Sequence, residues 1–275
     1  MIDLPTGASN RPAIDVARDA AARASAIMLE RFRALESGQR IEKTVKGRGN
    51  FVTESDLACE EAALQLLQSE YPDWQVLSEE TAGAVEDWDK GWLWVVDPID
   101  GTSNFSRGIP SFAFNIALCH DGEPVLGITQ QPVAGAEFFA VKGGGLTVNG
   151  VPARVSEAPT LADSLMGIGL GYEYDRAKLM LTLLSDIWPG VQMIQNIGSA
   201  ALGLAYAASG RFDIYVHSYL YPWDMAAGII QVREGGGIVL DRHGGPISIY
   251  SEGIIAGAPG PVRQFAEQTR ERRWR

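Results

Sequence analysis

Apolar residues near the start of the chain recur at helical spacing. Between residues 14 and 32 they fall every three or four positions, which predicts an amphipathic helix that ends by Gly38. A second helix is predicted to begin near Ser55 and Asp56 and to stop before Pro72, because a residue that precedes proline disfavours helical geometry. Short apolar runs predict strands at 51–53 and 74–77.

The pattern changes to strands in the middle of the chain. Residues 92–96 form a continuous apolar run, which is typical of a strand buried on both faces. Residues 112–118 and 125–129 are predicted to pair across an Asp121-Gly122 turn, and 138–141 continue the sheet. Strands and helices then alternate, with helices at 199–208, at 225–232 and from Pro261, and strands at 212–216, 238–240 and 254–256.

These elements predict a mixed α/β (α+β) protein. The chain has 275 residues and shows no repeat or linker, so we expect one compact domain over 1–275 with subdomains at about 1–150 and 151–275. Hydrophobic residues make up 46% and charged residues 21%, which are globular values, and no apolar stretch is long enough to span a bilayer. The net charge of −11 argues against nucleic acid and anionic membranes as partners.

The cysteine content and the N-terminal residues indicate in which cellular compartment the protein is expected. Cys59 and Cys119 are the only cysteines, so a disulfide framework is not indicated and a reducing environment fits. The first residues lack the basic and apolar regions of a secretory signal. We therefore expect a cytoplasmic protein.

The segment Asp97-Pro98-Ile99-Asp100-Gly101-Thr102 carries candidate chemistry, because it places two carboxylates directly after the buried strand. Pro98 and Gly101 favour a sharp turn that brings the carboxylates together. Two close carboxylates need a proton, a cationic side chain or a metal, and hard oxygen ligands without His or Cys favour Mg²⁺. From Thr102 onward the chain resembles a helix or turn start, whose N–H groups suit a phosphate. The alternative is an ordinary Asp-Pro and Asp-Gly turn.

Several segments of this chain, taken in order, resemble the signatures of the inositol monophosphatase family of metal-dependent sugar-phosphate phosphatases. The resemblance extends over nearly the whole sequence. It rests on Val52-Thr53-Glu54-Ser55-Asp56, Ser78-Glu79-Glu80, Val95-Val96-Asp97-Pro98-Ile99-Asp100-Gly101-Thr102-Ser103-Asn104-Phe105, Lys142-Gly143-Gly144-Gly145 with Asn149-Gly150, Gly198-Ser199-Ala200-Ala201-Leu202 and Pro222-Trp223-Asp224-Met225-Ala226-Ala227-Gly228.

The resemblance implies a layered α-β-α-β-α sandwich, of the type also found in fructose-1,6-bisphosphatase, and a Mg²⁺ site with two to three ions. Glu79, Asp97 and the carbonyl of Ile99 would hold one ion, and Asp97, Asp100 and Asp224 a second, with a weaker third near Glu79. Asp224 also has a plain structural interpretation, because Asp is a favoured helix N-cap. Glu80 is expected to be a supporting partner or a solvated acid.

The same resemblance implies catalytic roles for Thr102, Asp56 and Glu79. A water on the first ion attacks phosphorus, while Thr102, oriented by Asp56, positions that water and helps to deprotonate it. Backbone N–H groups of Gly101 and Thr102 would hold the phosphate. Lys46 matches a lysine of a metal-side loop, but an exposed lysine is usually solvated.

The substrate side departs from the inositol-preferring pattern. Ser199, His217 and Asp224 fall at substrate-contacting positions, although Ser199 can equally be a packing residue and His217 a structural histidine. His217 stands where the family commonly has an acidic residue, and Gln195 where it often has a basic one. A neutral imidazole donates at one nitrogen and accepts at the other, unlike a carboxylate. The surface that would hydrogen-bond to substrate hydroxyls is therefore expected to differ from that of inositol-preferring family members.

We thus expect a Mg²⁺-dependent phosphomonoesterase that acts on a small phosphorylated polyol or sugar, nominally inositol 1-phosphate. Fructose 1,6-bisphosphate, histidinol phosphate and an adenosine 3′,5′-bisphosphate are alternatives from the same superfamily. The resemblance also implies lithium inhibition and a homodimer. Two other classes stay open: a regulatory binding protein with this fold that acts through partners such as transcription machinery, and a structural protein that binds Mg²⁺.

Overall fold

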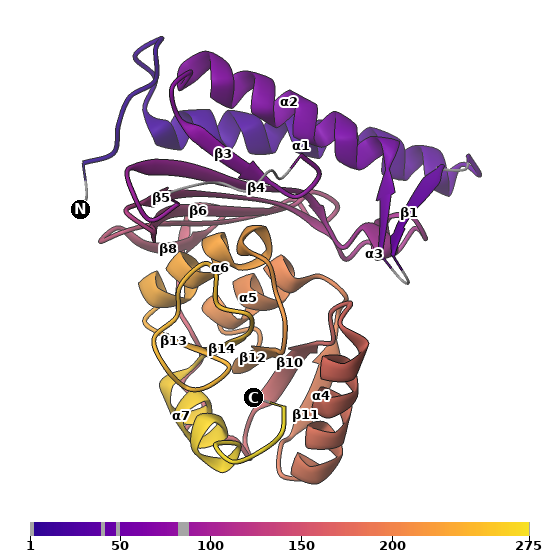
Figure 1. Ribbon diagram of the computed structural model, residues 1–275, viewed down its shortest axis with the longest axis vertical. Helices are drawn as coiled ribbons and strands as arrows, with labels where there is room; N and C mark the ends of the chain where they lie inside the picture. Colours follow the sequence, from indigo (N-terminus) through magenta and orange to yellow (C-terminus); the bar gives the residue numbers. More distant parts are fainter. Residues whose placement is uncertain (1–2, 40–41, 48–49, 82–87, 275) are drawn as a thin grey trace.

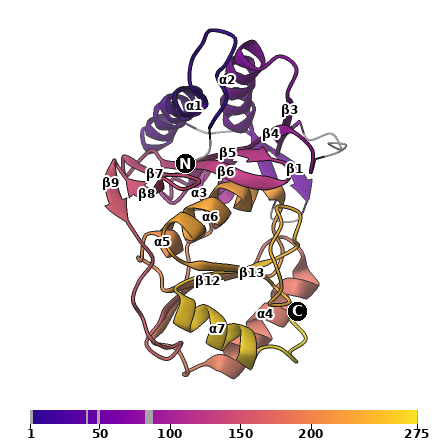
Figure 2. The ribbon, with the colours of Figure 1, turned by 90° about the vertical axis from the view of Figure 1, so that its left-hand side faces the viewer.

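The protein is built of five layers in the order α-β-α-β-α (Figure 1). The computed structural model describes residues 3–39, 42–47, 50–81 and 88–274. Helices α1 and α2 form the outer layer next to a seven-stranded sheet, α5 and α6 lie between this sheet and a five-stranded one, and α4 and α7 cover the far side (Figure 2). The predicted layered fold is therefore confirmed. The helices are α1 (Ala13–Glu36), α2 (Glu54–Glu70), α3 (Thr102–Phe105), α4 (Tyr174–Ile187), α5 (Ala200–Ala208), α6 (Pro222–Glu234) and α7 (Pro259–Gln268).

The first sheet has the strand order β3-β4-β5-β6-β7-β8-β9, and a separate hairpin, β1-β2, precedes it in the chain. Strands β5 and β6 pair antiparallel through the turn at Asp121 and Gly122, whose φ values of 50° and 79° are both positive, so the predicted hairpin is confirmed. The strands are β1 (Lys43–Gly47), β2 (Asn50–Thr53), β3 (Gln75–Ser78), β4 (Trp92–Asp100), β5 (Ala113–His120), β6 (Glu123–Gln131), β7 (Ala136–Val141), β8 (Gly145–Val148) and β9 (Val151–Ala153).

Strand β4 is buried along almost its entire length, as its apolar sequence predicts. The turn predicted from Pro98 and Gly101 is confirmed at Gly101 but not at Pro98, because β4 continues to Asp100 with an irregular register between Asp97 and Asp100. The chain turns instead at Gly101, which has a φ of 99°, and α3 begins at the next residue. A glycine is needed there because few L-residues adopt positive φ without strain.

The second sheet has the order β11-β10-β12-β14-β13. Its β10 and β11 and the neighbouring helix α4 were not predicted as individual elements. Gly167 and Gly169 lie inside β10, and glycine weakens the sequence signal of a strand. The strands are β10 (Leu165–Gly169), β11 (Met193–Asn196), β12 (Ile214–His217), β13 (Ile238–Asp241) and β14 (Ile254–Gly257).

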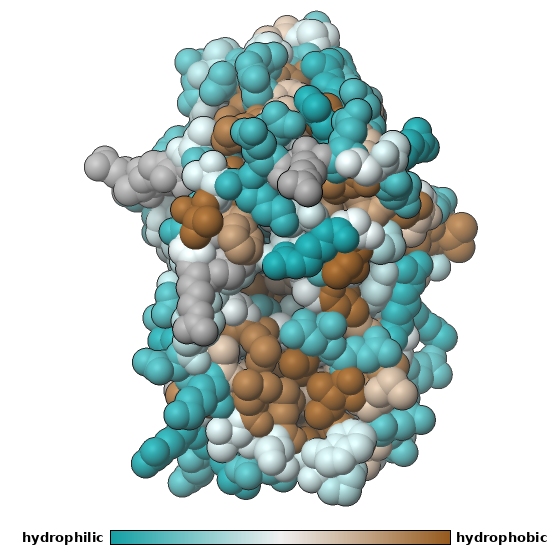
Figure 3. All heavy atoms as spheres, turned by 90° about the vertical axis from the view of Figure 1, so that its right-hand side faces the viewer, coloured by the Kyte–Doolittle hydropathy of each residue, from teal (hydrophilic) through white to brown (hydrophobic). Residues whose placement is uncertain are grey.

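Apolar side chains gather on the outer face formed by α4 and the edge strand β11 (Figure 3). Leu181, Trp188 and Met193 are each about half exposed there. Within the residues that the structure describes, no helix is both long and apolar enough to cross a membrane.

The middle helices pack closely against the first sheet, and this contact places the N-terminus of α6 beside the end of β4. Gly127 of β6 faces α6, and a Cβ at this position would lie 2.7 Å from Ile230 and 2.8 Å from the backbone of Ala227. The absence of a side chain at residue 127 therefore sets how near α6 can approach the sheet.

Replacing Gly127 by alanine is expected to lower the free energy of unfolding by about 1–3 kcal/mol, because the added methyl group overpacks the contact with α6. The measurement is urea unfolding in EDTA. Gly47→Ala is the control, because nothing lies within 4 Å of a Cβ there, and it should change stability by less than about 0.5 kcal/mol. Equal effects of the two substitutions would contradict the close approach.

Candidate metal and active site

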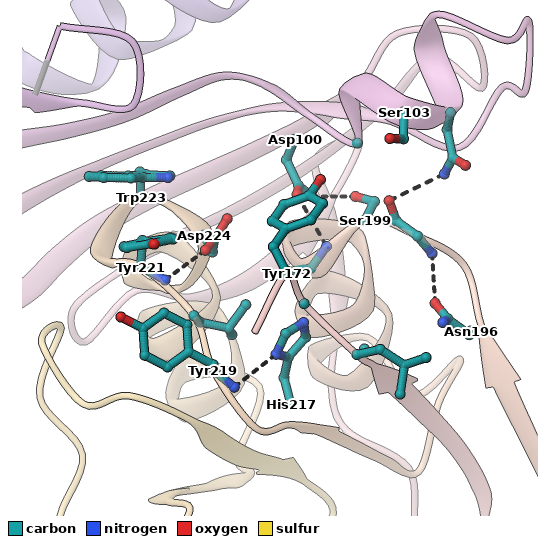
Figure 4. A pocket seen from close by; sticks show the side chains of 18 of the residues that line it. Asp100, Ser103, Tyr172, Asn196, Ser199, His217, Tyr219, Tyr221, Trp223 and Asp224 are labelled. Atoms are coloured by element: carbon teal, nitrogen blue, oxygen red, sulfur yellow. Dashed lines mark hydrogen bonds between the residues drawn. The ribbon is translucent and has the colours of Figure 1, made fainter. Parts of the chain in front are cut away.

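A cavity of about 250 Å³ lies where the first sheet, the middle helices and the second sheet meet. Its wall includes Asp100 from β4, Ser199 before α5, His217 from β12 and Asp224 from α6 (Figure 4). Residues far apart in sequence thus share one cavity because the layers bring the ends of their elements together.

Three carboxylates form a tight cluster at this cavity. Oxygen atoms of Asp97, Asp100 and Asp224 lie within 4.8 Å of one another. Asp97 is 1% exposed, and its Oδ1 has no hydrogen-bond partner among the described residues. An unpaired buried carboxylate oxygen is costly unless a cation compensates it. The all-oxygen donor set therefore fits a hard divalent cation such as Mg²⁺.

Asp100 joins the first sheet to helix α5. Its carboxylate accepts the N–H groups of Ala200 and Ala201 at 3.2 and 2.8 Å and the hydroxyl of Ser199. The Ser199 oxygen in turn accepts the Leu202 N–H at 3.2 Å, so Ser199 is the N-cap of α5. A carboxylate at a helix N-terminus is stabilised by the free N–H groups and the helix dipole.

Asp224 lies in the first turn of α6 rather than at its N-cap, because the helix begins at Pro222, three residues before the predicted start. Its Oδ2 accepts the Tyr221 N–H at 2.7 Å and so satisfies a free donor at the helix start. The Asn115 side chain, which lies opposite Asp97 in the sheet, donates to the Trp223 carbonyl at 2.7 Å. These two contacts fix Asp224 against the sheet.

The electrostatics of the cluster favour a bound cation. Burial raises the pKa of Asp97 well above its usual range, and the negative charges of Glu79, Asp100 and Asp224 raise it further. Burial and the charge of Asp100 likewise raise the pKa of Asp224. Burial also raises the pKa of Asp100, against the hydrogen bond from Ser199, which lowers it. A divalent cation would offset this repulsion and allow the carboxylates to remain ionised.

Thr102 and Asp56 are joined by a hydrogen bond just after the end of β4. The Thr102 hydroxyl is 2.8 Å from Oδ1 of Asp56 and 3.0 Å from the Ile99 carbonyl oxygen. The other oxygen of Asp56 accepts the backbone N–H and the hydroxyl of Thr53, at 2.8 and 2.5 Å. Burial raises the pKa of Asp56, while these hydrogen bonds lower it. Asp56 therefore fixes both the start of α2 and the orientation of the Thr102 hydroxyl.

Glu79 lines the cavity but lies outside the three-carboxylate cluster. Burial raises its pKa to about 7, although the ammonium group of Lys46, 3.6 Å away, opposes the shift. Lys46 also contacts Glu80 at 2.5 Å. Lys46 is therefore paired in this structure rather than simply solvated, and Glu80 is its partner.

Glu60 of α2 supports the segment that carries Glu79, a role that the sequence did not indicate. Its buried carboxylate accepts the N–H groups of Glu80 and Thr81 at 3.1 and 3.2 Å and the hydroxyl of Ser78. A glutamate on an amphipathic helix usually faces solvent, so no local signal distinguishes this one.

On the substrate side, the structure places His217, Gly101 and Ser199 at the cavity wall. Gln195 lies exposed on β11 and does not line the cavity. Tyr172 and Tyr215 line it as well, and neither was predicted from sequence.

Known proteins resemble this chain in sequence and in fold. The sequence profile described as the inositol monophosphatase family matches residues 9–275. A protein named Nus factor SuhB from Pasteurella multocida is 34% identical over 255 residues, which cover 92% of this chain and 94% of the relative. Inositol monophosphatase 1 from Solanum lycopersicum is 33% identical over 259 residues, with coverage of 92% and 93%.

A solved structure, that of the extragenic suppressor protein suhB from Bartonella henselae, matches with a TM-score of 0.85 and 33% identity and covers 94% of this chain and 98% of its own. The sequence profile and these relatives agree over nearly the full length. This chain therefore belongs to the inositol monophosphatase family.

Proposed function

We propose that the protein is a Mg²⁺-dependent phosphatase that hydrolyses a small phosphomonoester. The observation that carries the proposal is the cluster of Asp97, Asp100 and Asp224. Asp97 and Asp100 are buried, Asp100 and Asp224 line a ligand-sized cavity, and the Thr102 hydroxyl nearby donates to Asp56. A phosphatase family fits this set, because phosphoryl transfer needs positive charge at the phosphate and an oriented nucleophile.

Asp97, Asp100 and Asp224 would hold one Mg²⁺, and Glu79, Asp97 and the Ile99 carbonyl a second. Bound Mg²⁺ would supply an acidified water and would stabilise negative charge on the leaving oxygen. The chain's own residues orient the reactants. Because the Thr102 hydroxyl donates to Oδ1 of Asp56, its lone pair is free to accept a proton from the attacking water, and Asp56 can take up the hydroxyl proton.

Gly101 lines the cavity directly before α3, where the backbone N–H groups of Gly101 and Thr102 would hold phosphate oxygens. Inositol 1-phosphate is the nominal substrate by family, with fructose 1,6-bisphosphate, histidinol phosphate and adenosine 3′,5′-bisphosphate as alternatives. The homodimer and lithium inhibition expected from the family stay predictions.

A regulatory function is the second candidate, because relatives of this chain carry the name Nus factor SuhB. Phosphate release from a panel of inositol, sugar, nucleotide and histidinol phosphates, with Mg²⁺ or with EDTA, separates the two. Mg²⁺-dependent turnover of at least one ester supports the phosphatase. Folded protein that binds Mg²⁺ and cleaves none of them would contradict it and favour the regulatory function.

Asp97→Asn is expected to reduce Mg²⁺-dependent turnover to less than about a tenth of the wild-type value, because it removes a carboxylate that would hold both ions. It should also raise the melting temperature in EDTA, since one repelling buried charge is gone, and abolish the further rise caused by Mg²⁺. Calorimetry measures both. Asp73→Asn, at an exposed position away from the cavity, is the control. A normal Mg²⁺-induced rise in the Asp97 variant would refute its role as a ligand.

Thr102→Ala is expected to lower kcat by at least about 100-fold while the Mg²⁺-induced rise in melting temperature persists, because the hydroxyl orients the nucleophile and is not a ligand. Thr102→Ser keeps the hydroxyl and should recover most of kcat. Steady-state kinetics on the best ester of the panel provides the test. An unchanged kcat in the alanine variant would rule out Thr102 as an activating group.

A further inference from the structure

Two segments of the cavity wall lie outside any helix or strand. Residues 170–173 lead from β10 into α4, residues 219–221 lead from β12 towards α6, and both segments line the cavity. Tyr172 belongs to the first segment and Tyr219 to the second (Figure 4). Because neither segment has hydrogen bonds of regular structure to fix it, its position depends on contacts with other parts of the chain.

The two wall segments approach each other closely at Gly171. This residue has a φ of 66°, and a Cβ there would lie 3.2 Å from the carbonyl oxygen of Tyr219. The backbone of the first segment therefore lies almost against the backbone of the second. A displacement of one segment changes the space that is available to the other.

Arg176 contacts the second wall segment from outside the cavity. It is the third residue of α4, so it directly follows the first segment in the chain. Its guanidinium carbon lies 5.7 Å from the centre of the Tyr219 ring, which is within the range of a cation–π contact. Its Nη2 donates to Oε2 of Glu252 at 2.8 Å. Arg176 does not line the cavity.

Glu252 links Arg176 to the main chain of the second wall segment. Its backbone carbonyl accepts the Leu220 N–H at 2.6 Å. Its carboxylate also pairs with Nη2 of Arg242, whose side chain is only 10% exposed. A guanidinium with so little solvent needs a charged partner, so Arg242 holds the Glu252 carboxylate in place for Arg176.

These contacts suit positioning better than stabilisation of the whole fold. The Arg176 and Glu252 side chains are both partly exposed, and an ion pair of this kind adds little to the stability of a domain. Local displacement of a short loop, however, costs far less free energy than global unfolding. A weak contact can therefore decide where the loop lies without deciding whether the chain folds.

We propose that Arg176 is a positioning residue that holds the two wall segments together through Tyr219 and Glu252. It thereby fixes the part of the cavity wall that would face the alcohol portion of a phosphomonoester. Its effect on the substrate rests on the proposed phosphatase function, whereas the contact between the wall segments does not. Arg176 lies outside the three-carboxylate cluster, so the chemistry at phosphorus should not depend on it.

The first test is hydrogen–deuterium exchange, which is independent of catalysis. In Arg176→Gln, peptides that cover 170–173 and 219–221 should exchange at least about threefold faster than in the wild type, while β4 is unchanged. Arg272→Gln is the matched control, because Arg272 forms a similar pair with Asp186 at the other end of α4, 3.0 Å away. It should leave both wall segments unchanged.

Two outcomes of this experiment would overturn the proposal. Equal exchange of the wall segments in the wild type and in Arg176→Gln would show that Arg176 does not hold them. Faster exchange throughout the chain, β4 included, would assign Arg176 a general structural role.

The second test separates KM from kcat on the best ester of the phosphatase panel. Arg176→Gln should raise KM about three- to tenfold and leave kcat within about twofold, because the wall is displaced while the reacting groups are not. Arg176→Lys keeps the positive charge and should restore most of the KM. A fall in kcat at unchanged KM would overturn the positioning role. Wild-type protein that cleaves no ester would contradict the phosphatase function instead, and the exchange experiment would still decide the role of Arg176.

A double-mutant cycle tests whether Arg176 acts through Glu252. Glu252→Gln removes the charge but keeps the backbone carbonyl that binds Leu220. If both substitutions break the same contact, the double variant should have a KM no higher than that of Glu252→Gln alone. A KM increase equal to the product of the two single increases would contradict action through this pair.

Discussion

Mutual repulsion among buried carboxylates is the constraint on which the site depends. Oxygen atoms of Asp97, Asp100 and Asp224 lie within 4.8 Å of one another, and Asp97 and Asp100 are buried. Glu79 adds negative charge from the cavity wall. The folded chain tolerates this concentration of charge because α5 and the start of α6 donate hydrogen bonds to Asp100 and Asp224, while Lys46 faces Glu79. Asp97 Oδ1 has no such partner in the described part of the chain, and it is the atom that most needs a cation.

The layered architecture supplies the geometry that the chemistry requires. Strand β4 places two carboxylates near its C-terminal end, and α6 brings the third from the neighbouring layer. Asp100 accepts free N–H groups at the start of α5 across this boundary, so the same contact that joins two layers also fixes a candidate ligand. A rigid support of this kind suits catalysis, because small displacements of catalytic groups are costly in rate.

Much of this arrangement was predictable from sequence, for identifiable reasons. The apolar run of β4 and the turn chemistry at Asp121-Gly122 are local signals, and the order of the acidic motifs indicated the family. The true start of α6 also had a local signal, since Pro222 favours the first turn of a helix. Glu60 and Arg176 had none, because their roles arise from contacts with Ser78, Glu80 and Glu252, which lie far from them in sequence.

The proposed chemistry requires the three-carboxylate cluster to be a metal centre. A crystal structure of the full chain soaked in Mn²⁺, which takes similar oxygen ligands and scatters anomalously, tests it most directly. If the cluster binds metal, an anomalous peak should lie bonded to Asp97, Asp100 and Asp224. Manganese bound only elsewhere, with the three carboxylates ion-free at saturating metal, would contradict it.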